Sequence, residues 1–177
     1  MARLVLLDAD VVIRAFELGI WDKLVAKYEV VLARIVCERD VKFYDDPVTM
    51  LRKGIDLQPY LADGRVSVVD APLEWTAEVE KACRERLGGL HGQGELESIA
   101  IVKNEARDAL FCSADGFAIQ LMAVLRLTDK AVSFERLLKS VGLSRSFTSS
   151  EDLQYSEGKF KYWLRRGSIR LVETEDL

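Results

Sequence analysis

Short apolar segments, each long enough for one buried strand, alternate along this chain with longer segments of helical spacing. Leu4 to Leu7 is an unbroken apolar run, and further strand candidates follow at residues 29–32, 66–69 and 109–112. Helical spacing or helix start and stop signals mark residues 8–18, 20–27, 34–44, 73–87, 95–102, 115–125 and 133–141, with one more short helix expected between residues 48 and 64. This alternation predicts an α/β fold, with a central parallel sheet flanked by helices.

The chain changes character after residue 143. The chain of 177 residues is long enough to bury a full core, and residues 1–143 contain the alternating pattern. Residues 144–177 begin with the polar SRSFTSSEDLQYSEG and continue with the basic and aromatic KFKYWLRRGSIRLV. We therefore expect one α/β domain over residues 1–143 and a C-terminal extension over residues 144–177.

Composition argues against several classes of protein. The net charge of −4 gives no global basic field for nucleic acid, so such binding would need local patches. Three cysteines without a CxxC pair and a single histidine, His91, argue against a His/Cys zinc site and a serine–histidine hydrolase. No apolar run is long enough to cross a membrane or to form a secretory signal. We expect a cytoplasmic protein that does not associate with membranes.

Four carboxylates stand at the edges of the apolar segments: Asp8, Glu38, Glu95 and Asp115. Each alone is explained by helix capping or by a solvated helix face. In a parallel sheet, however, ligands bind beyond the carboxyl ends of the strands, where Asp8 and Asp115 lie. Glu38 and Glu95 belong to helices that can lean over the same edge. Carboxylates gathered there would repel one another unless a cation lay between them, and a divalent metal is the simplest such cation.

Three nearby residues are secondary candidates for this site. Residues 95 and 97 lie on different faces of one helix, so only one of the two can point into the site. We favour Glu95, because Gly94 marks the helix entrance, and keep Glu97 as the alternative. Ser113 is placed to hydrogen-bond a ligand or a metal-bound water, and Asp10 is placed either to join the metal shell or to cap the helix.

The four acidic segments, in this order, resemble those of PIN-domain proteins. LLDADVV resembles the first-strand aspartate segment, and IVCE resembles the segment of the helix glutamate. GELESIAIV resembles the helix of the subgroup with a GExEAIAL-like motif, and SADGFAIQLMAVL resembles the final serine/threonine-x-aspartate turn. The match covers about residues 1–143, whereas the extension beyond 143 is absent from the compact toxins of the family.

The resemblance implies a Rossmann-like PIN fold and a Mg²⁺- or Mn²⁺-dependent endoribonuclease that hydrolyses RNA phosphodiester bonds. It makes Asp8, Glu38, Glu95 and Asp115 the metal ligands and catalytic residues. Many members are VapC-type toxins, so an antitoxin protein partner and a homodimer are also implied. Carboxylate ligands suit these hard cations, and a metal-bound water removes the need for a histidine base.

Two other functions remain open. LLDADVV also fits the start of haloacid-dehalogenase-like phosphatases, with Asp8 as the nucleophile and Asp10 as the acid. That class needs a later lysine, for which Lys103 is the candidate, and an acidic pair where SADGFAI has one aspartate. The remaining alternative is a non-catalytic PIN-like module that binds RNA or a protein partner.

The basic and aromatic segment of the extension has two interpretations. Its cations (Lys159, Lys161, Arg165 and Arg166) and its rings are suited to phosphates and bases of a nucleic acid. The interpretation that we favour is an amphipathic segment whose aromatic face packs on the domain.

Overall fold

A four-stranded parallel sheet forms the centre of the protein. The structure is a computed structural model that describes residues 3–89, 92–105, 108–150 and 152–175. Its sheet contains β1 (Leu4–Leu7), β2 (Glu29–Ala33), β5 (Val66–Val69) and β6 (Ala109–Cys112), in the order β5-β2-β1-β6. All three strand pairs are parallel. The predicted α/β class is confirmed, and the four strands lie where the apolar segments placed them.

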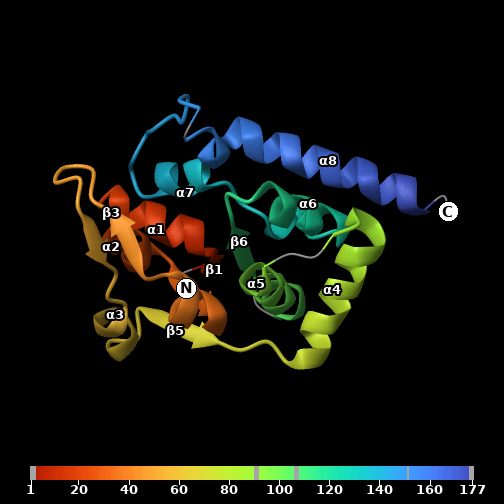
Figure 1. The fold of residues 1–177 in the computed structure, drawn as a ribbon, viewed down its shortest axis with the longest axis horizontal. Helices are drawn as coiled ribbons and strands as arrows, with labels where there is room; N and C mark the ends of the chain where they lie inside the picture. Colours follow the sequence, from red (N-terminus) through yellow and green to blue (C-terminus); the bar gives the residue numbers. More distant parts are fainter. Residues whose placement is uncertain (1–2, 90–91, 106–107, 151, 176–177) are drawn as a thin grey trace.

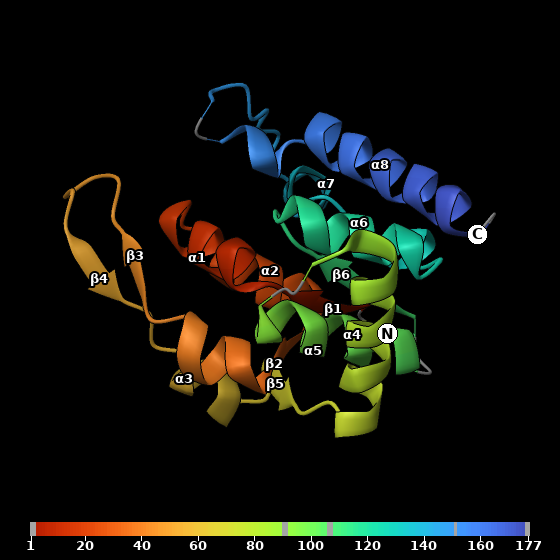
Figure 2. The same cartoon turned by 45° about the vertical axis from the view of Figure 1, so that its right-hand side comes forward.

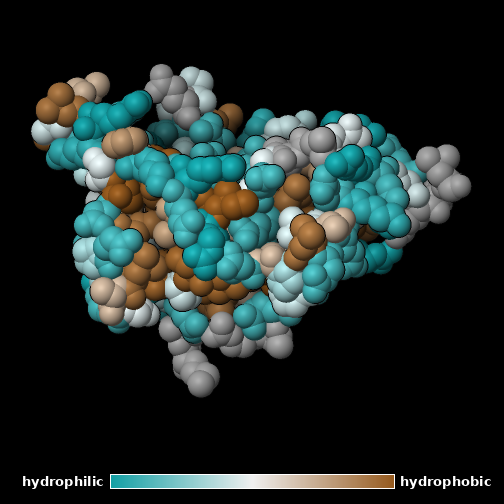
Figure 3. Space-filling view, turned by 60° about the horizontal axis from the view of Figure 1, so that its bottom comes forward, coloured by the Kyte–Doolittle hydropathy of each residue, from teal (hydrophilic) through white to brown (hydrophobic). Residues whose placement is uncertain are grey.

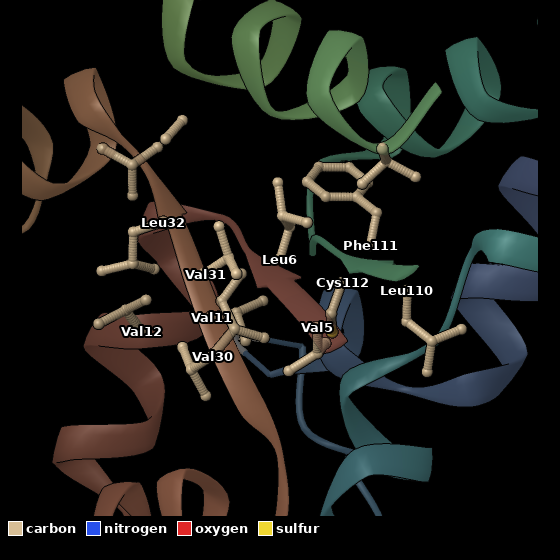
Figure 4. Close-up of a cluster of buried hydrophobic side chains, with 14 of the residues drawn as sticks. Val5, Leu6, Val11, Val12, Val30, Val31, Leu32, Leu110, Phe111 and Cys112 are labelled. Carbon is tan, nitrogen blue, oxygen red and sulfur yellow. The ribbon is translucent and has the colours of Figure 1, made fainter. Parts of the chain in front are cut away.

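The strands are apolar because helices cover both faces of the sheet. Every residue of β1 and β6 is buried, as expected for parallel strands enclosed on both sides. Leu6 pairs in register with Phe111, and Val5 pairs with Leu110. Figure 4 shows the first pair on one side of the sheet and the second pair on the other.

Eight α-helices surround this sheet in the described part of the chain (Figures 1 and 2). They are α1 (Ala9–Glu17), α2 (Trp21–Lys27), α3 (Gln58–Ala62), α4 (Leu73–Leu87), α5 (Gln93–Asn104), α6 (Gly116–Val124), α7 (Phe134–Ser140) and α8 (Glu157–Glu175). Short 3₁₀ turns occupy Thr128–Lys130 and Leu153–Tyr155. None of the helices described has the length and apolarity that a membrane crossing requires.

The predicted helix over residues 34–44 is wrong. The chain forms a π-helical turn, η1 (Val36–Asp40), and then enters β3 (Phe43–Asp45), which pairs with the antiparallel β4 (Arg52–Gly54). The turn is closed by a 3.0 Å hydrogen bond from the Val41 amide to the Val36 carbonyl, five residues apart. The wider ring of a π-turn changes which side chains point to a given side.

The short helix expected before Gly64 is present as α3, whereas the β3–β4 hairpin was not predicted. The two strands of the hairpin have three residues each and are largely exposed, so they lack the apolar pattern of the central strands. Hydrophobic residues gather at its tip, where Val48, Met50 and Leu51 are exposed (Figure 3). The tip turns through Met50, which has a φ of 57° without being glycine.

The C-terminal extension forms a long helix that lies along α6 (Figures 1 and 2). Two glycines permit this close approach. Gly116, the first residue of α6, lies beneath the indole of Trp163, and Gly167 of α8 lies against the Gln120 backbone and the Ala123 side chain. Phe160 is buried on the same side of α8. Packing by the aromatic face, the interpretation favoured from sequence, is what the structure contains.

Candidate functional site

The candidate site lies where the strand order of the sheet reverses. From β1 the chain moves outward through β2 to β5, and then returns to the other side of β1 as β6. At such a switch point the connections leave in opposite directions and a crevice opens beyond the strand ends. Asp8 follows β1 directly, and Ser113 to Asp115 follow β6. The Asp8 amide donates to the Cys112 carbonyl at 3.0 Å, so the two strand ends are held together.

Asp8 is the most deeply buried of the candidate acids, with 4% of its surface exposed. It caps α1: its Oδ1 accepts a hydrogen bond of 2.8 Å from the Ala9 amide. Its Oδ2 accepts one of 2.6 Å from the Ser113 hydroxyl. The pKa of Asp8 is raised to about 7, chiefly by burial and to a smaller extent by the charges of Glu95 and Asp10, while the hydrogen bonds from Ser113 and the Ala9 amide act in the opposite direction.

Ser113 joins two of the acids. Its hydroxyl donates to Asp8 and accepts a 3.0 Å hydrogen bond from the Asp115 amide. Asp115 caps α6, and its Oδ1 accepts from the amides of Phe117 at 2.7 Å and Ala118 at 2.9 Å. The short turn after β6 therefore fixes the positions of both Asp8 and Asp115.

Asp10 belongs to the same group of charges. Asp8 rather than Asp10 caps α1, which leaves Asp10 in the first turn, facing the crevice. Burial raises the pKa of the Asp10 carboxyl, as do the nearby charges of Asp115 and Glu95. Asp10 therefore does not cap α1, and its role in a metal shell stays a prediction.

Glu95 and Glu97 point to different places, as their spacing on α5 requires. Glu95 lines the crevice, and its carboxylate folds back over Gly92, where a side chain would collide with it. Glu97 is buried, and its two oxygens accept hydrogen bonds from the Ile35 amide at 3.3 Å and the Ala71 amide at 3.2 Å. Glu97 therefore holds the chain segments that follow β2 and β5.

Glu38 lies apart from this group, and it is not among the described residues that line the crevice. It sits in the π-turn, where its carboxylate is 2.8 Å from the Arg34 guanidinium, which also binds Asp70. Its side chain is 60% exposed. The expectation that Glu38 is a metal ligand has no geometric support in this arrangement.

Asp40, and not Glu38, is the acid of this segment that lies at the carboxyl edge of the sheet. It ends the π-turn and lines the crevice, with its carboxylate 3.0 Å from the point where a Cβ on Gly94 would stand. Arg39 also lines the crevice, and its Nε is 3.5 Å from Asp40. No sequence signal distinguished Asp40, because a regular helix over this segment would present Glu38 and Asp40 on different sides.

The crevice, called here the acidic cleft, has a volume of about 480 Å³. Its lining consists of Asp8, Ala9, Asp10, Ile13, Arg39, Asp40, Gly92, Gln93, Gly94 and Glu95. Oxygen donors of this kind suit Mg²⁺ or Mn²⁺, and a divalent cation would offset the repulsion that raises the pKa values of Asp8 and Asp10. In the side-chain positions described, no three His, Cys, Asp or Glu groups converge as ligands of one ion.

The remaining candidates that the structure describes are not part of the acidic cleft lining. Lys103 binds Glu78 of α4 at 2.6 Å and is not in the described lining of the cleft, so it does not supply the lysine that the phosphatase interpretation requires. Lys159 lies 5.0 Å from the ring centroids of both Tyr162 and Trp163. On the exposed side of α8, Lys161 binds Glu157 at 2.8 Å, and Arg165 and Arg166 face solvent. His91 lies outside the described residues.

A scan against models of known protein families gave no match to this chain, and a search of curated proteins gave none either. The PIN resemblance therefore rests on its four short motifs.

Proposed function

We propose that this chain is a PIN-type nuclease that hydrolyses RNA phosphodiester bonds with Mg²⁺ or Mn²⁺. The observation that supports the proposal most is the state of Asp8: a buried carboxyl with a pKa of about 7, surrounded by other acids at the switch point of a parallel sheet. Structural carboxylates are usually paired with cations, so two acids whose pKa values are raised by burial and by the charges of neighbouring acids point to a functional site.

The residues that would hold the metal are Asp8, Asp10 and Glu95 of the cleft lining, with Asp40 as a further ligand from the π-turn. Asp115 is not in the described lining, but it belongs to the set because its charge acts on Asp10 and its amide is bonded to Ser113, the partner of Asp8. Glu38 is no longer part of the proposed set, because it is bound to Arg34 outside the cleft. A bound divalent ion would supply a nucleophilic hydroxide near neutral pH and offset negative charge on the phosphate.

Other groups of the site would orient the metal ligands or the substrate without binding the metal themselves. Ser113 donates a hydrogen bond to Asp8 Oδ2 and so favours the ionised form of that carboxyl, which is the form that binds a cation. Helix caps fix Asp8 and Asp115, so neither carboxylate has to be ordered when a ligand arrives. Arg39 is a cation in the described cleft lining and is placed to contact a phosphate of the substrate strand.

The test is cleavage of a labelled single-stranded RNA by the purified full-length protein, with Mn²⁺, with Mg²⁺ and with a chelator. We expect metal-dependent cleavage that Asp8→Asn and Asp115→Asn each abolish. Asp129→Asn removes one exposed carboxylate and is the matched control, with activity retained. Cleavage that persists in both site variants would overturn the assignment of the site.

A parallel assay with para-nitrophenyl phosphate separates the nuclease from a phosphatase. Phosphate release that depends on Asp8, without RNA cleavage, would favour the haloacid-dehalogenase-like mechanism. Stable RNA binding without any metal-dependent cleavage would favour the non-catalytic alternative.

A further inference from the structure

A second cavity, of about 570 Å³, lies beside the acidic cleft, between the last turn of α1 and the β3–β4 hairpin. In both ribbon views β3 runs alongside α1 (Figures 1 and 2). The cavity lining consists of Arg14, Phe16, Glu17, Leu18, Gly19, Tyr44, Asp46, Pro47, Val48 and Arg145. The volume lies within the range of small-molecule sites.

Aromatic rings form part of the cavity wall. Phe16 of α1 and Tyr44 of β3 have ring centroids 5.9 Å apart and planes tilted by 37°. Behind Phe16, Trp21 is stacked at 5.1 Å and is almost fully buried, so the Phe16 ring is held rigidly. The Tyr44 hydroxyl has no hydrogen-bond partner among the described residues. This wall offers a planar ligand a stacking surface and a phenol hydroxyl, which interacts electrostatically with Lys53.

Charges around the cavity are balanced. Two arginines and two carboxylates line it, which leaves no formal net charge. Arg14 binds Glu17 at 2.7 Å and Asp152 at 2.5 Å, and Lys53 forms an ion pair with Asp46. A lining whose ions are paired in this way suits a neutral planar group better than a phosphate.

The cavity lies along the same helix as the acidic cleft. Asp10 and Ile13 of α1 line the cleft, whereas Arg14 and Phe16 line the cavity. At 1.5 Å per residue, Asp10 and Phe16 are about 9 Å apart along the helix axis. Neighbouring nucleotides of a stacked strand are roughly 3.4 Å apart, so this distance corresponds to about three nucleotides.

We propose that this cavity, called here the base pocket, binds one nucleobase of the RNA strand a few nucleotides from the bond that is cut. The proposal rests on the proposed function and assigns a role to two parts of the chain outside the central sheet. The hairpin provides Tyr44, and the C-terminal extension provides Arg145 and the Asp152 carboxylate that fixes Arg14. Stacking on Tyr44 and Phe16 supplies the affinity, and the Tyr44 hydroxyl is placed to contact the base edge.

The test uses the full-length protein and nucleoside 5′-monophosphates as probes, with ribose 5-phosphate as the base-free control. We expect ligand-observed NMR to detect millimolar binding of a monophosphate that ribose 5-phosphate does not displace. Tyr44→Ala should weaken this binding about tenfold, as expected for the loss of one base–aromatic stack. Phe43→Ala is the matched control, because Phe43 precedes Tyr44 on β3 and does not line the cavity.

A second variant keeps the test valid if Tyr44→Ala destabilises the fold. Tyr44→Leu preserves apolar volume but removes the ring, and it should also lose binding while its melting temperature stays near that of the wild type. With RNA as the substrate, both variants should raise KM about tenfold and leave kcat close to the wild-type value, because the pocket touches no reacting atom.

The outcomes separate this proposal from the nuclease assignment. RNA cleavage with unchanged KM in both Tyr44 variants would overturn the base pocket and leave the nuclease standing. Monophosphate binding that depends on Tyr44, without any RNA cleavage, would support the pocket and overturn the nuclease. If no monophosphate binds the wild-type protein, the base pocket is refuted, and the side chain of a protein partner becomes the occupant to test.

Discussion

Replacing Asp8 by asparagine should stabilise the metal-free protein while abolishing its proposed activity. Burial and neighbouring carboxylates raise the pKa of Asp8 from 3.8 to about 7, so its ionised form is disfavoured in the folded state. A difference of about 3 pKa units corresponds to ~4 kcal/mol, which is an upper bound on the destabilisation above pH 7. Asparagine has nearly the same shape, has no charge, and is equally suited to cap α1.

The sign of the pH dependence follows from the raised pKa. Below about pH 4 the carboxyl is protonated in both the folded and the unfolded state, and the group has no effect on stability. Between pH 4 and 7 the unfolded chain releases the proton first, so the wild-type protein loses stability as the pH rises. Above pH 7 both states are ionised and the destabilisation is constant. The advantage of Asp8→Asn should therefore grow from pH 4 to 7 and then level off.

The assay is urea unfolding in a chelator at pH 4, 5.5 and 8, for the wild-type protein, Asp8→Asn and the exposed-site control Asp129→Asn. We expect the control to follow the wild type within about 0.5 kcal/mol at every pH. Mn²⁺ should stabilise the wild type at pH 8 and have much less effect on Asp8→Asn. The reasoning is refuted if Asp8→Asn is less stable than the wild type at pH 8, or if its advantage is the same at all three pH values.

Further predictions concern other residues of the site and the packing of α8. Ser113→Ala removes a hydrogen bond that lowers the pKa of Asp8, so the acidic limb of the pH–rate profile for RNA cleavage should move to higher pH. Glu97→Gln leaves one of two partly buried amides without an acceptor and should lower the free energy of unfolding by about 1–3 kcal/mol, with activity per folded molecule retained. Glu95→Gln should abolish cleavage and leave the free energy of unfolding in urea unchanged, which is the opposite pattern to that of Glu97→Gln. Gly167→Leu forces a side chain against the Gln120 backbone and should lower the melting temperature, whereas Gly158→Leu, where a Cβ would meet open space, should not cause comparable damage.

The central sheet could be predicted because its strands are constrained on both faces. A strand such as Leu4–Leu7 is enclosed by helices on two sides, so every position must be apolar and the run is visible in the sequence. The hairpin strands β3 and β4 have mostly exposed side chains, and the tip turns through Met50 instead of glycine. Neither the burial pattern nor the turn chemistry on which a sequence prediction depends is present there.

The acids that directly follow strands could be placed for a similar reason. Parallel strands end at one edge of the sheet, so Asp8 and Asp115 had to lie near each other once β1 and β6 were recognised as neighbours. The different directions of Glu95 and Glu97 needed only the period of a helix together with the position of its first turn, whereas the role of Glu95 as a metal ligand stays a prediction. Regular geometry was sufficient for each of these residues.

Glu38 and Asp40 show where regular geometry is no longer sufficient. The Arg34–Tyr44 segment has the composition of a helix, but the bond between Val36 and Val41 spans five residues and the chain then leaves as a strand. Arg34 and Asp70 together hold η1 at the end of β2, and Glu38 neutralises Arg34 there. Asp40 is left to face the cleft beside Gly94, where a larger residue would be crowded by Val36 and Asp40. The identity of this acid therefore depends on tertiary contacts between η1 and α5, which no local pattern in either segment records.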